Sequence, residues 1–431
     1  MTTADIQMPL SSLAEQAQPA PDTALWHSVR TWWLLVPMLY FATAGTLIVG
    51  QDFARGTNFV GTGSAFTRSE QTGAWLIAVL AMLPSYRKIL TAIRSYKPFI
   101  VMLALALASV FWSPVPADSL RRVTLLGLTI AFGYFLVAKY SPEDQMRLMF
   151  AIGRIAVLLG LLLIFAAPYY GQTDTGEWRG IFGSHADSGM FLCFLLSPYP
   201  FLKIIGTFNR LSSLIIVLLG FLEIFMTQSR GGWLLAAVLI GYWLVVVLLR
   251  KFPAIEALSI VNMLLILGGG LAWLLYENFA SFTYLIGKDP SLTHRTLIWR
   301  AVRIAIGKRP ILGYGYGGFW NGFEGESANV ILSIGVNITH AHDGYLNIWL
   351  QLGVLGLGLF ISILVLAFKD AFKGFFIRRA SVASWYFGIL LLTIVGSVDE
   401  SFLMKYDALT TILLVVACVG LRQAARSEIA A

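Results

Sequence analysis

Residues 340–368 read HAHDGYLNIWLQLGVLGLGLFISILVLAF, a short polar segment with two histidines that runs directly into an apolar stretch. The apolar part, 345–368, is longer than the roughly 20 residues that a helix needs to cross a bilayer. Similar runs recur along the chain, of which 57% is hydrophobic and 13% charged, whereas soluble domains carry about 25% charged residues. These features predict an all-α polytopic membrane protein.

The apolar runs predict about twelve transmembrane helices within a membrane domain of residues 28–431. The predicted spans are 31–50, 73–93, 98–112, 120–138, 148–168, 189–206, 211–227, 232–249, 257–276, 345–368, 382–398 and 408–421. Residues 1–27 are polar and contain several prolines, so we expect a disordered cytoplasmic tail there. Cys193 and Cys418 both lie in predicted spans, which makes a disulfide framework or a cysteine-based metal site unexpected.

The positions of Lys and Arg predict the orientation of the chain in the membrane. If the N-terminus is cytoplasmic, the cytoplasmic segments hold 18 of these residues and the short outer loops hold 7. Because positive charge collects on the cytoplasmic side, both termini should be cytoplasmic, and the long loop 277–344 should face outward. The net charge of +8 then reflects membrane anchoring, and we expect no nucleic-acid partner.

The long loop should contain a helix. Residues 289–293, DPSLT, form a helix-start signal, and Gly307 and Pro310 predict its end. One face of this helix carries its cationic and aromatic side chains, Arg295, Trp299, Arg300 and Arg303. The opposite face is aliphatic, as in a helix that lies in the membrane interface or faces a ligand. The alternative is a helix packed on the protein surface with solvated arginines.

Two further segments of the loop attract interest. Residues 313–320, GYGYGGFW, lack the Lys-Ser/Thr ending of a phosphate-binding loop. They suit a flexible surface that contacts sugar or lipid, or else a purely structural turn.

His340 and His342 lie at the mouth of the next span, where an imidazole can take a proton near neutral pH, oriented by Asp343 or another carboxylate. A structural histidine is the alternative, and without Cys or Glu-x-x-His spacing we predict no metal.

Other polar groups gather at predicted outer helix ends. Arg230, in the segment TQSRGG of residues 227–232, can pair bidentately with phosphate oxygens or extend to the interface as an anchor. Glu223 in the same span is interpreted as structural. The loop 178–189 contributes Arg179, His185 and Asp187 to the same outer cavity, and Asp399 and Glu400 could close its acidic side. Candidate substrate-binding residues are Arg179, His185, Arg300, Arg303, His340, Asp343 and Tyr345.

Four motifs in order resemble the O-antigen ligase and polymerase superfamily, over roughly residues 178–360. They are Arg-Gly-Ile-Phe-Gly at 179–183, Ser-Arg-Gly-Gly at 229–232, Arg-x-x-x-Trp at 295–299 with Pro-x-x-Gly-x-Gly at 310–315, and His-Asp-Gly-Tyr-Leu at 342–346 with Gly-x-x-Gly at 353–356. The sequences of these motifs are most similar to those of exopolysaccharide repeat-unit polymerases. Two departures are Asp343, where the family has Asn, and His185-Ala186 in place of Lys-Asn.

The resemblance implies a GT-C-like glycosyltransferase that uses undecaprenyl-diphosphate-linked oligosaccharide and needs neither a metal nor a nucleotide sugar. Arg230 and Arg295 would hold the diphosphate, and His342 would activate the acceptor hydroxyl. We therefore expect repeat-unit polymerisation on the outer face of a bacterial inner membrane, with a flippase and a chain-length regulator as possible partners. The alternatives are ligation of glycan to lipid A-core or protein and, more distantly, secondary transport.

Overall fold

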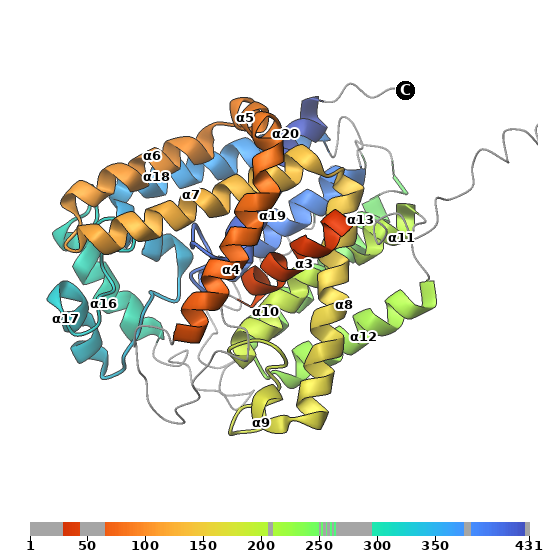
Figure 1. Cartoon of the computed structure of the whole chain (residues 1–431), viewed down its shortest axis with the longest axis horizontal. Coiled ribbons are helices and arrows are strands. Elements are labelled where there is room, and N and C mark those ends of the chain that lie inside the picture. Colours follow the sequence, from red (N-terminus) through yellow and green to blue (C-terminus); the bar gives the residue numbers. More distant parts are fainter. Residues whose placement is uncertain are drawn as a thin grey trace, which may run out of the picture.

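The computed structural model describes residues 29–43, 65–205, 210–249, 295–374 and 381–426, and a few positions between 251 and 263. Within these ranges the regular structure is helical, and extended backbone pairs only at an isolated bridge between Gln172 and Trp178 (Figure 1). The predicted tail 1–27, most of span 257–276 and the helix-start signal at 289–293 lie outside the described residues.

The described part of the chain contains seven helices that are long and apolar enough to cross a membrane. They are Ser69–Ser95, Pro116–Lys139, Pro142–Ala166, Arg230–Leu249, Gly344–Phe372, Val382–Asp399 and Leu409–Arg426. Three shorter apolar helices are Trp33–Ala42, Pro98–Trp112 and Leu211–Met226. The prediction of a multi-pass helical membrane protein is therefore confirmed, whereas the number of twelve spans stays a prediction.

The first half of the chain contains α3 (Val29–Ala42), α4 (Ala65–Met82), α5 (Tyr86–Ser95), α6 (Pro98–Ala108), α7 (Pro116–Lys139), α8 (Pro142–Ala166) and α9 (Pro168–Gly171), with 3-10 turns η2 (Leu83–Ser85) and η3 (Ser109–Trp112). Of these, α6, α7, α8 and α9 begin at prolines. Proline suits a first helical position because its missing N–H would have no partner there. Ser141 completes the start of α8 by accepting a hydrogen bond from the Asp144 backbone N–H.

The second half contains α10 (His185–Leu196), α11 (Tyr199–Ile205), α12 (Arg210–Met226), α13 (Arg230–Leu249), α16 (Arg295–Lys308), α17 (Gly325–Ile334), α18 (Gly344–Phe372), α19 (Ser381–Asp399) and α20 (Leu409–Arg426). The predicted single span 189–206 is wrong, because two helices occupy it. Pro198 cannot donate the backbone hydrogen bond that would continue α10, so the chain starts again at α11. The start of α10 lies earlier than predicted because Ser184 caps it.

The main core is formed where α20 packs against α7, α18 and α19. Nearly every residue of α20 from Leu409 to Leu421 is buried, as expected for a helix surrounded by others. On one side α6, α7 and α18 run next to one another, and on the other α10 lies among α8, α12 and α13 (Figure 1). This packing fixes the ends of α10, α13, α18 and α19, which carry the candidate site.

The loop helices form a second, smaller core against α18. Helices α16 and α17 lie together at one end of the bundle (Figure 1). Ile298, Val302 and Ala305 of α16 are buried there, whereas Leu297 and Ile304 stay exposed. The aliphatic face of α16 therefore packs largely on protein, as in the alternative considered above, and only its edge is free to contact lipid.

Most of the glycine-rich segment 313–320 forms a buried turn, and only Gly317 and Trp320 are partly exposed. The rings of Tyr314, Tyr316 and Phe319 are buried, so they cannot form the sugar- or lipid-contacting surface that the sequence suggested as one possibility. The turn fits against a break in α18 at Gly353, whose φ of 67° is in the left-handed region. A Cβ at Gly353 would collide with the Ile311 carbonyl, so glycine is required for this close approach.

Candidate active site

The start of α18 places the two histidines. The Asp343 carboxylate accepts a hydrogen bond from the Leu346 backbone N–H at 2.9 Å and so caps the helix. Burial raises the pKa of this carboxyl group. Just before the cap, His342 has a φ of 49°, which turns the chain sharply. Of the two orienting groups considered from the sequence, Asp343 is therefore used by the helix rather than by the imidazole.

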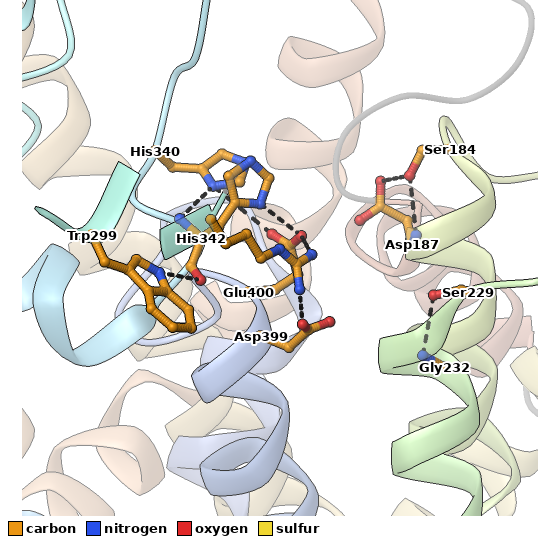
Figure 2. Close-up of polar contacts among 10 residues, drawn as sticks. Ser184, Asp187, Ser229, Gly232, Trp299, His340, His342, Asp399 and Glu400 are labelled. Atoms are coloured by element: carbon orange, nitrogen blue, oxygen red, sulfur yellow. Dashed lines mark hydrogen bonds and ion pairs between the residues drawn. The ribbon is translucent and has the colours of Figure 1, made fainter. Parts of the chain in front are cut away.

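A carboxylate from another helix contacts the imidazole instead. Glu400, which follows α19, lies with Oε1 2.9 Å from His342 Nδ1 (Figure 2). Burial raises the pKa of Glu400, but the hydrogen bond from His342 and the positive charge of Arg295 outweigh it and hold this pKa below its ordinary value. Glu400 is thus an ionised hydrogen-bond acceptor near neutral pH. It can orient the ring and stabilise its protonated form.

His340 packs on its neighbour. The two imidazole rings lie 4.0 Å apart between centroids, and the His342 backbone N–H donates to His340 Nδ1 at 3.3 Å. The same Nδ1 is 3.8 Å from Glu400 Oε2. Burial lowers the pKa of His340 to about 3, so this imidazole is neutral under physiological conditions. A neutral Nδ1 is consistent with its role as acceptor.

Helix α16 brings a cation to the same carboxylates. The Arg295 guanidinium forms an ion pair with Asp399 and lies 3.3 Å from Glu400 Oε1. One turn further along, Trp299 Nε1 donates to the His342 carbonyl at 3.3 Å, because residues four apart share a helix face. Burial lowers the pKa of Arg295, Glu400 opposes that effect, and the charge of Arg230 adds to it. The arginine remains a cation whose charge is partly shielded from water.

Helix α13 begins beside this network. Arg230 is exposed at its first turn, and Ser229 Oγ accepts from the Gly232 backbone N–H at 3.1 Å. A Cβ at Gly232 would meet the backbone of Gly189, and one at Gly231 would meet Asp399. The two glycines therefore let α13 approach α10 and the end of α19 closely, as Ser229, Gly232 and Asp187 illustrate in Figure 2. Arg230 is linked to the network through its charge, which acts on Arg295.

The remaining candidates lie at varying distances from this network. Arg179 donates to the carbonyls of Tyr169 and Tyr170, at 3.0 and 2.9 Å. His185 Nδ1 lies 2.9 Å from the Thr227 carbonyl. The Tyr345 hydroxyl donates to the Ile394 carbonyl at 3.1 Å and joins α18 to α19. These three make backbone contacts that hold helices and loops together, rather than contacts with the imidazole or its carboxylate.

Two more arginines of α16 face solvent. Arg300 and Arg303 are both exposed. The charge of Arg303 favours the ionised form of Asp343 and so reduces the rise in the Asp343 pKa that burial causes. Their position allows contact with headgroups or a long glycan but does not bring them to the imidazole.

The cluster is also a possible cation site. One ligand atom from each of His340, His342 and Glu400 falls within 4.8 Å of the others, and zinc accepts such a set of nitrogen and oxygen donors. The sequence argument against a metal considered only Cys and short histidine spacings, and it could not see a third donor 58 residues away. The Arg295 guanidinium competes for the same carboxylate. Metal independence therefore stays a prediction.

Sequence comparisons agree with this helical membrane architecture. Residues 215–361 match the family model described as O-Antigen ligase. Over 321 residues, 70% of each chain, the protein is 26% identical to the exopolysaccharide production protein ExoQ of Rhizobium meliloti (strain 1021). Over 89 residues it is 35% identical to "Putative polysaccharide ligase RP358" of Rickettsia prowazekii (strain Madrid E), which covers 20% of this chain and 22% of that protein.

The fold defines a polytopic helical membrane protein whose ionisable groups gather at one set of helix ends. The family match over residues 215–361 and the two relatives support the resemblance to the O-antigen ligase and polymerase superfamily. Arg230, Arg295 and His342 all lie within the matched residues, whereas Asp399 and Glu400 lie beyond them. The sequence predicted those two carboxylates as a possible acidic side of the outer cavity but did not name them as catalytic or substrate-binding residues.

Proposed function

We propose that this protein polymerises polysaccharide repeat units by transferring an undecaprenyl-diphosphate-linked glycan to a hydroxyl group of an acceptor repeat unit. The observation that carries the proposal is the single network in which Glu400 contacts both His342, at 2.9 Å, and Arg295, at 3.3 Å. A base for the acceptor hydroxyl and a cation for the leaving group are thereby within reach of one reacting carbon.

His342 acts as the general base. Its Nδ1 is engaged by Glu400, so Nε2 is the nitrogen left to accept the proton of the acceptor hydroxyl. The deprotonating oxygen attacks the anomeric carbon, and the bond from that carbon to the diphosphate oxygen breaks. Arg295 and Arg230 stabilise the negative charge that develops on the departing lipid diphosphate, as preorganised cations do in other transferases. Glu400 stabilises the imidazolium until it loses its proton.

The proposal extends to topology and location. Twelve spans in a GT-C-like arrangement would place residues 277–344 outside the cytoplasm of a bacterial inner membrane, with residues 1–27 and both termini inside. A flippase that delivers lipid-linked units and a chain-length regulator are the expected partners. The distribution of Lys and Arg supports this orientation.

A ligase reaction is the second candidate, in which the acceptor is lipid A-core or a protein. The match to the O-Antigen ligase model and the similarity to a polysaccharide ligase favour it. The polymerase is preferred because the relative that spans 70% of the chain is an exopolysaccharide production protein. Both reactions would use the same base and cations, and they differ in the acceptor.

The experiment is reconstitution of the purified protein in lipid nanodiscs with lipid-linked repeat units as the sole glycan. We expect a ladder of longer products on a gel with the wild type. His342→Ala and Arg295→Ala should give none, although both variants reach the membrane in normal amounts. Products confined to one transfer onto added lipid A-core would identify a ligase, and a full ladder from both variants would refute the mechanism.

A further inference from the structure

A cavity of about 340 Å³ adjoins the network at His340 and Glu400. His340 and Glu400 belong to its wall, whereas Arg230 and Arg295 are not among its lining residues. Its volume lies within the roughly 300–1,000 Å³ that is typical of small-molecule sites. A ligand in this cavity would therefore contact Glu400 and His340, both of which contact His342, without touching the cations assigned to the diphosphate.

The charges of the wall suit a neutral ligand. Arg122 and Lys405 contribute two positive charges, and Asp187 and Glu400 contribute two negative ones, so the formal charges cancel. The Arg122 guanidinium is already bonded to the Gly317 carbonyl. A diphosphate would meet two carboxylates here, while a sugar with its hydroxyl groups would meet donors and acceptors in balance.

Side-chain amides and an indole give the wall its shape. Trp320 Nε1 donates to Asn347 Oδ1 at 3.1 Å, and the Gly317 backbone N–H donates to Gln351 Oε1 at 2.8 Å. Both amide oxygens are used within the protein, which leaves the amide N–H donors of Asn347 and Gln351 available to a ligand. The Trp320 ring is held edge-on by Phe319, with centroids 4.8 Å apart, and is a fixed aromatic surface on the cavity.

One buried hydroxyl in the wall lacks a partner. Ser401 Oγ, next to Glu400, makes no hydrogen bond with any other described residue, although the side chain is buried. A buried hydroxyl without a hydrogen bond is destabilising, so such a group usually has a partner outside the protein chain. A sugar hydroxyl in the cavity would supply that partner.

We propose that this cavity binds the terminal sugar of the acceptor glycan, with Ser401 as hydrogen-bonding partner and Trp320 as the surface on which the ring lies. The inference rests on the proposed glycan transfer and adds to it the position of the acceptor. The donor diphosphate lies at Arg230 and Arg295, and the acceptor approaches His342 from the cavity that His340 and Glu400 line. Ser401 and Trp320 are positioning residues in this arrangement.

The test uses the full-length protein in nanodiscs and a lipid-free repeat-unit oligosaccharide, released by mild acid from the lipid-linked substrate. Binding is measured by equilibrium dialysis, and the same oligosaccharide then serves as acceptor at a fixed donor concentration. In Ser401→Ala we expect the dissociation constant and the acceptor KM to rise about 2- to 10-fold, with the donor KM unchanged. The variant loses no protein hydrogen bond, so its thermal stability should be retained. Trp320→Ala should weaken acceptor binding further, and Trp320→Phe should restore part of it.

Ser333→Ala is the matched control, because Ser333 is an exposed serine of α17 that does not line the cavity. It should leave every constant unchanged. Unchanged acceptor KM in Ser401→Ala and Trp320→Ala, or no oligosaccharide binding by the wild type at 20-fold the working acceptor concentration, would overturn the assignment. Failure of the wild type to extend any lipid-linked unit would instead refute the proposed transfer, while the dialysis still reports whether the cavity binds sugar.

Discussion

Replacement of Glu400 by Gln tests whether the carboxylate acts through the imidazole. The substitution keeps the shape of the side chain and removes one negative charge that lies 2.9 Å from His342 Nδ1 and 3.3 Å from Arg295 Nη2. The amide oxygen can still accept a hydrogen bond from the ring, so orientation is partly retained. What is lost is the attraction between the carboxylate and the imidazolium that forms during transfer.

The structure allows an estimate of this loss. A hydrogen bond to a charged group contributes about 1.5–3 kcal/mol, and Coulomb's law at an effective dielectric constant of 20 gives about 4 kcal/mol for unit charges 4 Å apart. Each 1.36 kcal/mol corresponds to a factor of about ten in rate. We therefore expect kcat to fall by about 10- to 1,000-fold in Glu400→Gln, with a smaller change in donor KM.

Asp399→Asn is the comparison, because Asp399 pairs with the same guanidinium, whereas the two histidines contact Glu400. Its side chain is 21% exposed, and a partly exposed ion pair contributes about 1 kcal/mol or less. Initial rates of polymer formation should therefore fall less than about fivefold. The acid limb of the rate against pH should move to lower pH in Glu400→Gln alone, because an amide favours the charged ring less than a carboxylate does. Equal losses of kcat in the two variants would refute the orienting role and leave Glu400 only as a partner of Arg295.

Three further outcomes follow from the geometry. Polymer formation should be the same with and without EDTA; a loss that zinc restores would instead assign a metal to the donor set of His340, His342 and Glu400. The pKa of His340 is about 3 in the folded protein against an ordinary 6.5, so between pH 3 and 6.5 only the unfolded chain binds the proton. The free energy of unfolding should therefore fall as pH decreases, by at most about 1.4 kcal/mol per pH unit. This slope, measured by thermal unfolding at several pH values, should be smaller in His340→Gln. Gly353→Ala should lower the unfolding temperature, because its φ is positive and an added Cβ would collide with the Ile311 carbonyl. An added Cβ at Gly358, on the same helix, meets open space, so Gly358→Ala should preserve or raise the unfolding temperature. Equal effects of the two substitutions would contradict the account of the α18 break.

The membrane spans could be predicted from the sequence because they depend on local properties. A run of apolar residues such as 345–368 must form a helix in a bilayer, whatever surrounds it. The end of α16 near Gly307 could also be predicted, because it depends on helix-stop residues that are close together in the sequence. The error at 189–206 arose from Pro198, whose effect was masked by the uniform hydrophobicity around it. Where local and tertiary preferences agree, sequence reasoning therefore succeeds.

The candidate site depends on contacts between distant segments, and there the sequence was only partly informative. Arg230, Arg295 and His342 stand in motifs that could be recognised individually, but nothing local indicates which carboxylate reaches the ring. Asp343 was the obvious neighbour, yet an Asp directly before a helix is the usual cap of that helix. Glu400 is 58 residues from His342 in the chain, and the packing of α18 against α19 brings them together.

The charge balance of the network suggests how the donor enters. Arg230 and Arg295 are offset by Asp399 and Glu400, so the empty site is close to neutral rather than strongly cationic. A partly buried guanidinium without an anion would be costly, and the carboxylates remove that cost. The donor diphosphate can take the place of a carboxylate beside Arg295 only if that carboxylate is not held by another group. Glu400 is held by the imidazole and is the less exposed of the two, at 15% against 21%, so Asp399 is the group that the donor should displace. The pair of carboxylates would then serve separate steps, one keeping the arginine charged until the donor arrives and the other remaining with the base throughout the transfer.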